Sequence, residues 1–186
     1  EVSVKEMVGA FSIYANKGVY NVPMMVTKIE DKYGNVLANF YPESREVITE
    51  NTAFLMANLL QGVVDEGTGR RLRFRYGFKN QIGGKTGTTQ NHSDGWFIGI
   101  TPDLAGGVWV GAEDRSIHFQ NLANGQGASM ALPIWALFMQ KVYADKSLAV
   151  PQSDFQKPNG VNHVLDCGDA DREGMTDYDS SDEIFD

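Results

Sequence analysis

The side chains best suited to chemistry gather in one glycine-rich stretch, residues 83–89, which reads GGKTGTT. If this stretch is a strand, Lys85 and Gly87 share one face and Thr86 and Thr88 share the other, because side chains alternate along a strand. Gly87 has no Cβ, so a ligand can lie close to the backbone there. An ammonium, hydroxyls and a bare backbone on one edge suit an extended peptide ligand that carries a carboxylate.

The residues Gly84, Lys85 and Thr86 also resemble the end of a phosphate-binding loop. That motif needs a glycine five positions before the one at Gly84 and a helix after the Lys-Thr pair. Lys79 occupies the first of these positions. After Thr86 the chain runs through turn-forming residues at 90–95 into an aromatic and β-branched segment. We therefore expect a strand here and exclude the phosphate-binding loop.

Three consecutive antiparallel strands are predicted over residues 81–89, 94–101 and 106–112, with a turn at 101–104 between the last two. In the middle strand, apolar side chains fall on both faces, including Trp96 and Ile98 on one and Phe97 on the other. Such a pattern indicates a sheet covered on both sides. The expected fold class is therefore α+β, an α/β sandwich with helices on both faces of an antiparallel sheet.

Helices are predicted where capping signals precede apolar residues at helical spacing. Ser3 and Glu6 form a capping box for a first helix that ends near Lys17. Thr49 caps a second helix over 50–66, and a third spans 129–143. The predicted buried stripe of the second helix is Phe54, Leu55, Asn58, Leu59, Gly62 and Val63. That of the third is Leu132, Trp135, Phe138, Met139 and Val142. A hairpin is predicted from 22–31 and 35–41.

The apolar pattern ends at Val150, after which Pro151, Pro158 and Gly160 interrupt the chain, so we divide the 186 residues into two parts, 1–150 and 151–186. The net charge is −8, and residues 166–186 hold nine acidic side chains and one arginine, so that the remainder is neutral. We expect 151–186 to be an acidic, mostly disordered tail. The neutral remainder has no basic footprint for nucleic acid, and no apolar run is long enough for a membrane span. Cys167 is the only cysteine, which excludes an internal disulfide.

Several other residues have both a functional and a simpler interpretation. A cluster of basic residues precedes the glycine-rich stretch: Arg70, Arg71, Arg73, Arg75 and Lys79. Its functional interpretation is contact with an anionic glycan-peptide or another polyanion. We favour the simpler interpretation, a solvated loop. His92 and Asp94 lack a third ligand at metal-binding spacing, so we expect a loop and no metal. Ser93 lies beside His92, but the sequence offers no acid to orient the histidine, so we do not expect the pair to act as a nucleophile and base. The three tryptophans are expected in the core.

The longer pattern around the glycine-rich stretch resembles the transpeptidase domain of class A penicillin-binding proteins, which contain Ser-x-x-Lys, Ser-x-Asn and Lys-Thr-Gly motifs. The similarity extends from Val2 to about Tyr143 and includes residues 14–20 (YANKGVY), 28–31 (KIED), 60–64 (LQGVV) and 66–69 (EGTG). The resemblance implies acyl transfer: a serine attacks the D-Ala-D-Ala carbonyl of a peptidoglycan stem peptide, and β-lactams acylate the same serine.

The resemblance also implies roles for four residues. Lys85 and Thr88 are the expected catalytic residues, Lys85 through its charge and Thr88 through a backbone N–H that stabilises the oxyanion. Thr86, Gly87 and Thr88 are the expected substrate-binding residues, with the two threonine hydroxyls holding the substrate carboxylate. No metal and no cofactor are expected.

The nucleophile motifs are missing from the sequence. No serine has Lys three positions later or Asn two positions later. We therefore expect the C-terminal part of such a domain, inactive alone and completed by the upstream part of the same polypeptide, which is anchored at the extracytoplasmic face of the membrane. The alternative is a non-catalytic peptide- or partner-binding module of the same fold.

Overall fold

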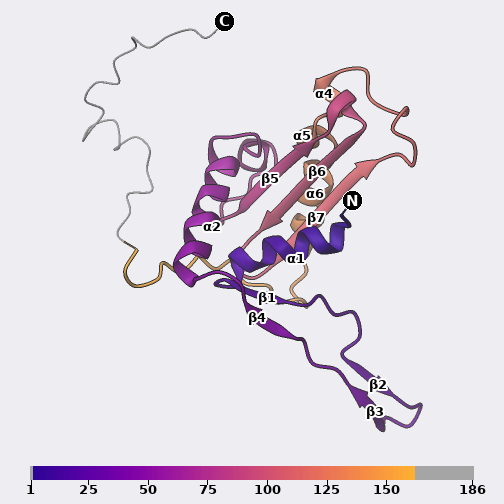
Figure 1. Cartoon of the computed structure of the whole chain (residues 1–186), viewed down its shortest axis with the longest axis vertical. Helices are drawn as coiled ribbons and strands as arrows, with labels where there is room; N and C mark the ends of the chain where they lie inside the picture. The colour runs from indigo at the N-terminus through magenta and orange to yellow at the C-terminus, as the bar shows by residue number, and fades with distance from the viewer. Residues whose placement is uncertain (1, 162–186) are drawn as a thin grey trace, which may run out of the picture.

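A three-stranded antiparallel sheet forms the centre of the computed structural model, which describes residues 2–161 (Figure 1). The strands are β5 (Gly83–Thr88), β6 (Asp94–Ile100) and β7 (Ala105–Gly111), and β6 lies between the other two. The predicted order and antiparallel pairing are confirmed. Because Lys85 lies within a strand and no helix begins there, the exclusion of a phosphate-binding loop is confirmed as well.

Helices cover both faces of this sheet, as the apolar pattern predicts. The helices α1 (Val4–Ala15) and α2 (Glu50–Asp65) contact one face, whereas α5 (Gly127–Met130) and α6 (Leu132–Ala144) contact the other. Short helices occupy three connections: α3 (Arg71–Phe74), η1 (Gln90–His92) and α4 (Leu122–Gly125). Among the residues that the structure describes, no helix is both long and apolar enough to cross a membrane.

Both predicted N-terminal caps are present. The Ser3 side chain accepts from the Glu6 N–H, and the Glu6 carboxylate accepts from the Ser3 N–H at 2.7 Å, which completes the capping box. The hydrogen bonds from Ser3, that of its backbone N–H foremost, lower the pKa of the Glu6 carboxyl. Thr49 caps α2 by accepting from the Thr52 N–H. Local side-chain chemistry therefore fixes where α1 and α2 begin.

The buried side of α2 differs from the predicted one. Its buried residues are Ala53, Ala57, Leu60 and Val64, whereas Leu59 of the predicted stripe is 65% exposed. Small residues face the sheet because β5 approaches closely: a Cβ on Gly83 would lie 3.0 Å from the Leu60 Cβ and 3.3 Å from the Ala57 oxygen. The prediction assumed that the large apolar residues of α2 are the buried ones. The observed buried side is displaced from the predicted one by about one residue position.

The α6 stripe is correct except at one residue. Leu132, Trp135, Met139 and Val142 are buried, but Phe138 is 60% exposed and Ala136 is buried instead. Trp135 enters the sheet at a hollow formed by paired glycines, since a Cβ on Gly99 would meet its ring. The Trp135 and Phe97 rings pack edge to face with centroids 5.3 Å apart.

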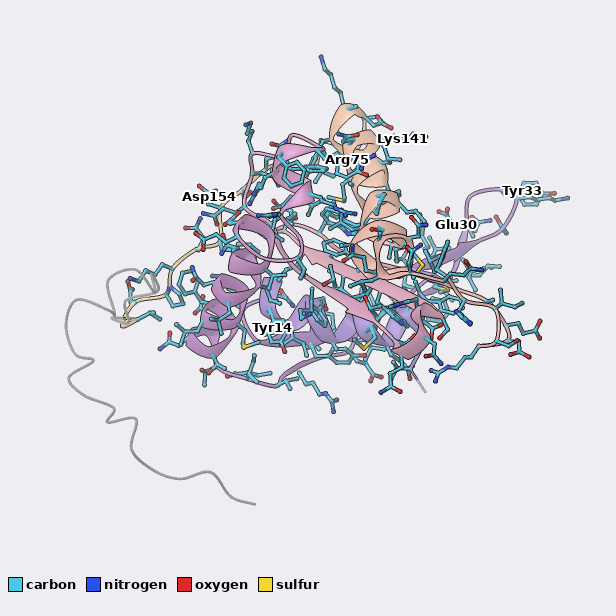
Figure 2. The ribbon with its side chains drawn as sticks, turned by 90° about the horizontal axis from the view of Figure 1, so that it is seen from above. Tyr14, Glu30, Tyr33, Arg75, Lys141 and Asp154 are labelled. Carbon is cyan, nitrogen blue, oxygen red and sulfur yellow. The ribbon has the colours of Figure 1, made fainter. Side chains whose placement is uncertain are left out.

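A two-stranded arm, residues 19–46, projects from the body (Figure 1). At its base β1 (Val19–Asn21) pairs with β4 (Ser44–Glu46), and near its tip β2 (Lys28–Glu30) pairs with β3 (Val36–Asn39). Figure 2 shows Tyr33 at the far end. The predicted hairpin is thus confirmed only near the tip. Pro23 and Pro42 lie between the two pairs, and proline cannot donate to a strand ladder.

The segment after α6 returns along the body. The Phe155 N–H donates to Gln81 Oε1 at 2.8 Å, the Ser153 N–H and hydroxyl contact the Asp103 carboxylate, and Val161 is only 4% exposed. The prediction of a mostly disordered tail covers residues 151–186, and within the described part of it Ser153 and Phe155 contact the body while most of the other residues are exposed. The acidic run at 166–186 lies outside the described residues.

Replacing Trp135 by alanine is expected to destabilise the chain by about 3–5 kcal/mol, because it empties the space between α6 and the sheet. The free energy of unfolding is measured by urea denaturation. Phe138→Ala, on the same helix but exposed, is the matched control and is expected to change it by less than about 0.5 kcal/mol. Equal losses for the two variants would contradict the observed orientation of α6.

Candidate active site

The strand β5 lies at one edge of the sheet, so that one row of its backbone groups is not used in pairing with β6. The Thr89 N–H donates to the Asp94 oxygen on the β6 side at 3.1 Å. Hydrogen-bonded and non-hydrogen-bonded pairs alternate along an antiparallel ladder. The N–H groups of Lys85 and Gly87 therefore point toward β6, and those of Thr86 and Thr88 point toward the open edge.

The side chains of β5 divide between the two faces as the alternation predicts. Lys85 and Gly87 lie opposite Ile98 and Trp96 on the α1 and α2 side. Thr86 and Thr88 lie on the α5 and α6 side, where Thr88 contacts α5. Lys85 is exposed, and its Nζ donates to the Thr86 carbonyl oxygen at 2.7 Å. The ammonium therefore rests along the open edge.

Each of the two threonine hydroxyls has a partner from another element. Thr88 Oγ1 accepts from the Gly127 N–H at the start of α5, at 3.0 Å. Thr86 Oγ1 lies 2.7 Å from Thr68 Oγ1, which belongs to the loop between α2 and α3. Gly127 can approach Thr88 because it lacks a side chain: a Cβ there would clash with the Gly87 and Trp96 carbonyl oxygens. Thr68 and Gly127 therefore lie beside the predicted site residues, which follow one another along β5.

Thr68 and Gly127 were both missed by the sequence analysis. Thr68 lies between Gly67 and Gly69, just after the predicted end of the second helix at residue 66, and Gly127 precedes the predicted third helix. They lie 18 and 39 residues from their partners. No local periodicity or capping rule connects positions so far apart, so the only available signal was that residues 66–69 belong to a segment shared with the resembled family.

A buried carboxylate closes the turn between β5 and β6. Asp94 is 8% exposed, and its Oδ1 accepts from Trp109 Nε1 at 3.1 Å while its Oδ2 accepts from the Thr89 hydroxyl at 3.1 Å. Arg115 lies 3.6 Å away. Asp94 thus joins β5, β6 and β7. Within residues 2–161 no three His, Cys, Asp or Glu side chains are grouped to hold a metal. Trp109 is 40% exposed, contrary to the expected core position.

The basic cluster is the solvated segment that we favoured only at Arg70, Arg75 and Lys79. Arg71 to Phe74 form α3, and Arg71 donates to the Ala128 oxygen at 2.9 Å and to Ser129 Oγ at 2.8 Å in α5. Arg73 pairs with Asp65 at 2.7 Å and also donates to the Phe78 and Asn80 carbonyls. These two arginines are structural links, whereas Arg70, Arg75 and Lys79 are exposed and make no contact that bears on the site.

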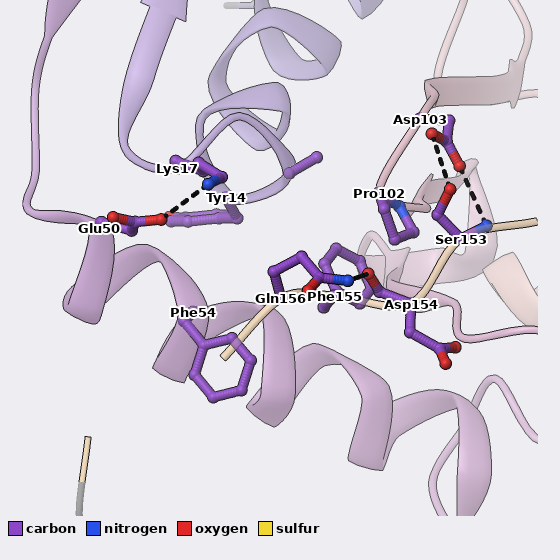
Figure 3. A pocket seen from close by; sticks show the side chains of 11 residues that line it. Tyr14, Lys17, Glu50, Phe54, Pro102, Asp103, Ser153, Asp154, Phe155 and Gln156 are labelled. Atoms are coloured by element: carbon purple, nitrogen blue, oxygen red, sulfur yellow. Dashed lines mark hydrogen bonds and ion pairs between the residues drawn. The ribbon is translucent and has the colours of Figure 1, made fainter. Parts of the chain in front are cut away.

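Two cavities differ in their relation to β5. One, of about 280 Å³, borders Lys85 and Gly87 and is lined mainly by apolar side chains, including Phe11, Trp96 and Ile98. The other, of about 300 Å³, lies beyond the opposite end of β5, near the turn between β6 and β7 (Figure 3). It contains none of the predicted site residues. We therefore place the candidate site at the open edge beside the first cavity.

Solved structures of penicillin-binding proteins share this fold. Penicillin-binding protein 1A from Haemophilus influenzae matches with a TM-score of 0.75 at 23% identity, over 85% of this chain and 28% of that one. The PonA1 protein from Mycobacterium tuberculosis in complex with penicillin V matches with a TM-score of 0.64 at 23% identity, over 83% and 40%. This chain therefore has the fold of these domains.

Sequence comparison identifies the family. Residues 1–128 match the penicillin binding protein transpeptidase domain, and the chain belongs to this family. It is 34% identical over 158 residues to penicillin-binding protein 1A of Aquifex aeolicus and 32% identical over 166 residues to penicillin-binding protein 2D of Bacillus subtilis. The alignments cover 85% and 86% of this chain but only 20% and 22% of those relatives. The resemblance to the transpeptidase domain of class A penicillin-binding proteins is confirmed.

Asp94→Ala is expected to destabilise the chain by about 2–3 kcal/mol, because the indole N–H of Trp109 and the hydroxyl of Thr89 lose their buried acceptor. Asp154→Ala, at an exposed carboxylate, is the matched control and should leave the unfolding midpoint unchanged. Denaturant unfolding of both variants measures the difference. If the two midpoints coincide, Asp94 does not hold the turn.

Proposed function

We propose that this chain supplies the substrate-binding edge of a serine-type D,D-transpeptidase that cross-links peptidoglycan stem peptides, and that β-lactams bind the same edge. The main support is that the Thr88 N–H points away from β6, toward the open edge of the sheet. Lys85 and two threonine hydroxyls lie at the same edge. Membership of the penicillin-binding transpeptidase family agrees with this use of the edge.

The edge is suited to bind a peptide that ends in a carboxylate. The outward backbone groups of Thr86 and Thr88 can pair with an extended peptide as an additional strand does. The hydroxyls of Thr86 and Thr88 donate to the terminal carboxylate, and Gly87 leaves room for close approach. Lys85 Nζ donates to the Thr86 carbonyl oxygen, and this oxygen can accept a second hydrogen bond from a ligand N–H. The positive charge of Lys85 then lies close to the bound anion.

Acyl transfer at this edge proceeds in two steps. A serine oxygen bonds to the carbonyl carbon of the D-Ala-D-Ala bond, the negative oxygen of the tetrahedral intermediate accepts from the Thr88 N–H, and the C–N bond breaks as the serine proton passes to the departing D-Ala amine. An amine of a second stem peptide then attacks the ester, and the serine regains its proton. Lys85 favours the anionic substrate and assists the proton transfer.

The serine itself must come from outside these residues. No serine here has the Ser-x-x-Lys context. We propose that the upstream part of the same polypeptide supplies it, together with a Ser-x-Asn motif and an anchor at the extracytoplasmic face of the membrane, where stem peptides are found. A polypeptide that lacks these motifs would instead be a peptide-binding module of the same fold.

The isolated chain is expected to remain unlabelled by a fluorescent penicillin, whereas the complete polypeptide forms a covalent adduct. Acylation requires an activated serine, which the edge alone does not supply. Fluorescence on a denaturing gel measures the adduct. Stoichiometric labelling of the isolated chain would show that one of its own serines is the nucleophile.

In the complete polypeptide, Lys85→Ala is expected to slow acylation by on the order of 10²-fold, as the loss of one electrostatic contact does at other acyl-transfer sites. Thr86→Val should mainly weaken carboxylate capture, and Thr88→Ala should be milder because the backbone N–H remains. Lys79→Ala, at an exposed lysine just before β5, is the control. Second-order acylation rates are measured for all four variants. An unchanged rate for Lys85→Ala would show that Lys85 takes no part in the mechanism.

A further inference from the structure

The loop between α2 and α3 places a hydroxyl beside the candidate carboxylate site. Thr68 Oγ1 lies 2.7 Å from Thr86 Oγ1, a distance typical of an O–H···O hydrogen bond. We propose that Thr68 is a positioning residue, whose hydroxyl donates to Thr86 and so directs the Thr86 proton toward a carboxylate at the open edge. This inference rests on the proposed function, because it names a further residue of the same site.

The backbone holds Thr68 in place. The Gly69 N–H donates to the Val63 oxygen at 2.8 Å, and the Gly67 N–H donates to the Gly62 oxygen at 3.1 Å. Gly67 packs so tightly on the last turn of α2 that a Cβ would lie 2.9 Å from the Val63 Cα. Gly69 is buried. The backbone position of Thr68 therefore follows from main-chain contacts on both sides of it.

The direction of the hydrogen bonds follows from the chemistry of the partners. A backbone N–H can only donate, so Thr88 Oγ1 must accept from Gly127 and its own proton remains available. Between Thr68 and Thr86 either hydroxyl can donate. A carboxylate accepts only, so once it takes the Thr86 proton, Thr68 must become the donor to Thr86. The resulting chain, from Thr68 through Thr86 to the anion, strengthens each of its hydrogen bonds by polarisation.

A purely structural role makes a different prediction. If Thr68 only ties the loop to β5, its loss should affect ligands with and without a carboxylate alike. If Thr68 directs the Thr86 proton, its loss should affect ligands with a free carboxylate far more than their esters, because a hydrogen bond to a charged acceptor is the stronger one. The probes are benzylpenicillin and its methyl ester, which differ at that group.

The experiment measures second-order acylation rates of the complete polypeptide. Thr68→Val removes the hydroxyl at nearly constant shape, and we expect it to slow acylation by benzylpenicillin by on the order of 10-fold, as the loss of one hydrogen bond in a charged chain implies. The rate of acylation by the ester should change less than about 2-fold, which is the size of effect expected from a surface substitution that removes no important contact. Thr68→Ser should restore the preference for the free acid. Thr27→Val, at an exposed threonine of the arm, is the matched control.

A double variant tests whether Thr68 acts through Thr86. Contacting residues that act as one unit are not additive, so Thr68→Val combined with Thr86→Val should be no slower than Thr86→Val alone. Equal slowing of acid and ester, or full additivity, would overturn the positioning role while leaving the proposed function intact. Absence of any labelling of the unmodified polypeptide would overturn the proposed function and this inference with it.

Discussion

The contact between Trp135 and the paired glycines Gly99 and Gly106 sets the distance between α6 and the sheet. A Cβ on Gly99 would lie 2.5 Å from the Trp135 ring, and one on Gly106 would lie 3.0 Å from its Nε1. The indole therefore fills space that side chains on two neighbouring strands would otherwise occupy. The short helix α5 approaches the sheet in the same way, because Gly127 lies directly over the Gly87 and Trp96 carbonyl oxygens. The hydrogen bond from Gly127 to Thr88 thus depends on a position without a side chain.

The arrangement of the edge depends equally on the register of β5 against β6. Pairing of Thr88 with Gly95 places the Thr86 and Thr88 N–H groups at the open edge and directs the two threonine side chains to the α5 and α6 side of the sheet. A slip of one residue would turn these N–H groups toward β6 and move the threonine side chains to the other face. The Asp94 carboxylate with its Thr89 partner fixes one end of this register. Gly83, which admits Leu60 and Ala57, fixes the other.

The sequence predicted the features that depend on local chemistry or on alternation. Ser3 and Thr49 cap helices as their side chains dictate, and the faces of β5 and β6 follow from a period of two. The sequence analysis failed where burial or pairing depends on elements that are distant in the sequence. Leu59 and Phe138 are exposed because Ala57 and Ala136 fit against closely approaching elements, and size alone suggested the opposite. Arg71 became a link to α5 because a helix 57 residues later lies beside it, which no charge pattern encodes.

Thr68 and Gly127 support the edge in different ways. The Gly127 N–H can only donate, so it occupies one acceptor position of the Thr88 oxygen and leaves the Thr88 proton free to donate. Between Thr68 and Thr86 either hydroxyl can donate, and in the proposed site an anion that takes the Thr86 proton sets the direction of this hydrogen bond. Binding of an anion at the proposed site then requires the rotation of hydroxyl protons alone, and such preorganisation reduces the free energy lost in ordering polar groups around a ligand. It also requires partners from three separate elements, β5, the loop after α2 and the start of α5, which only the tertiary structure brings together.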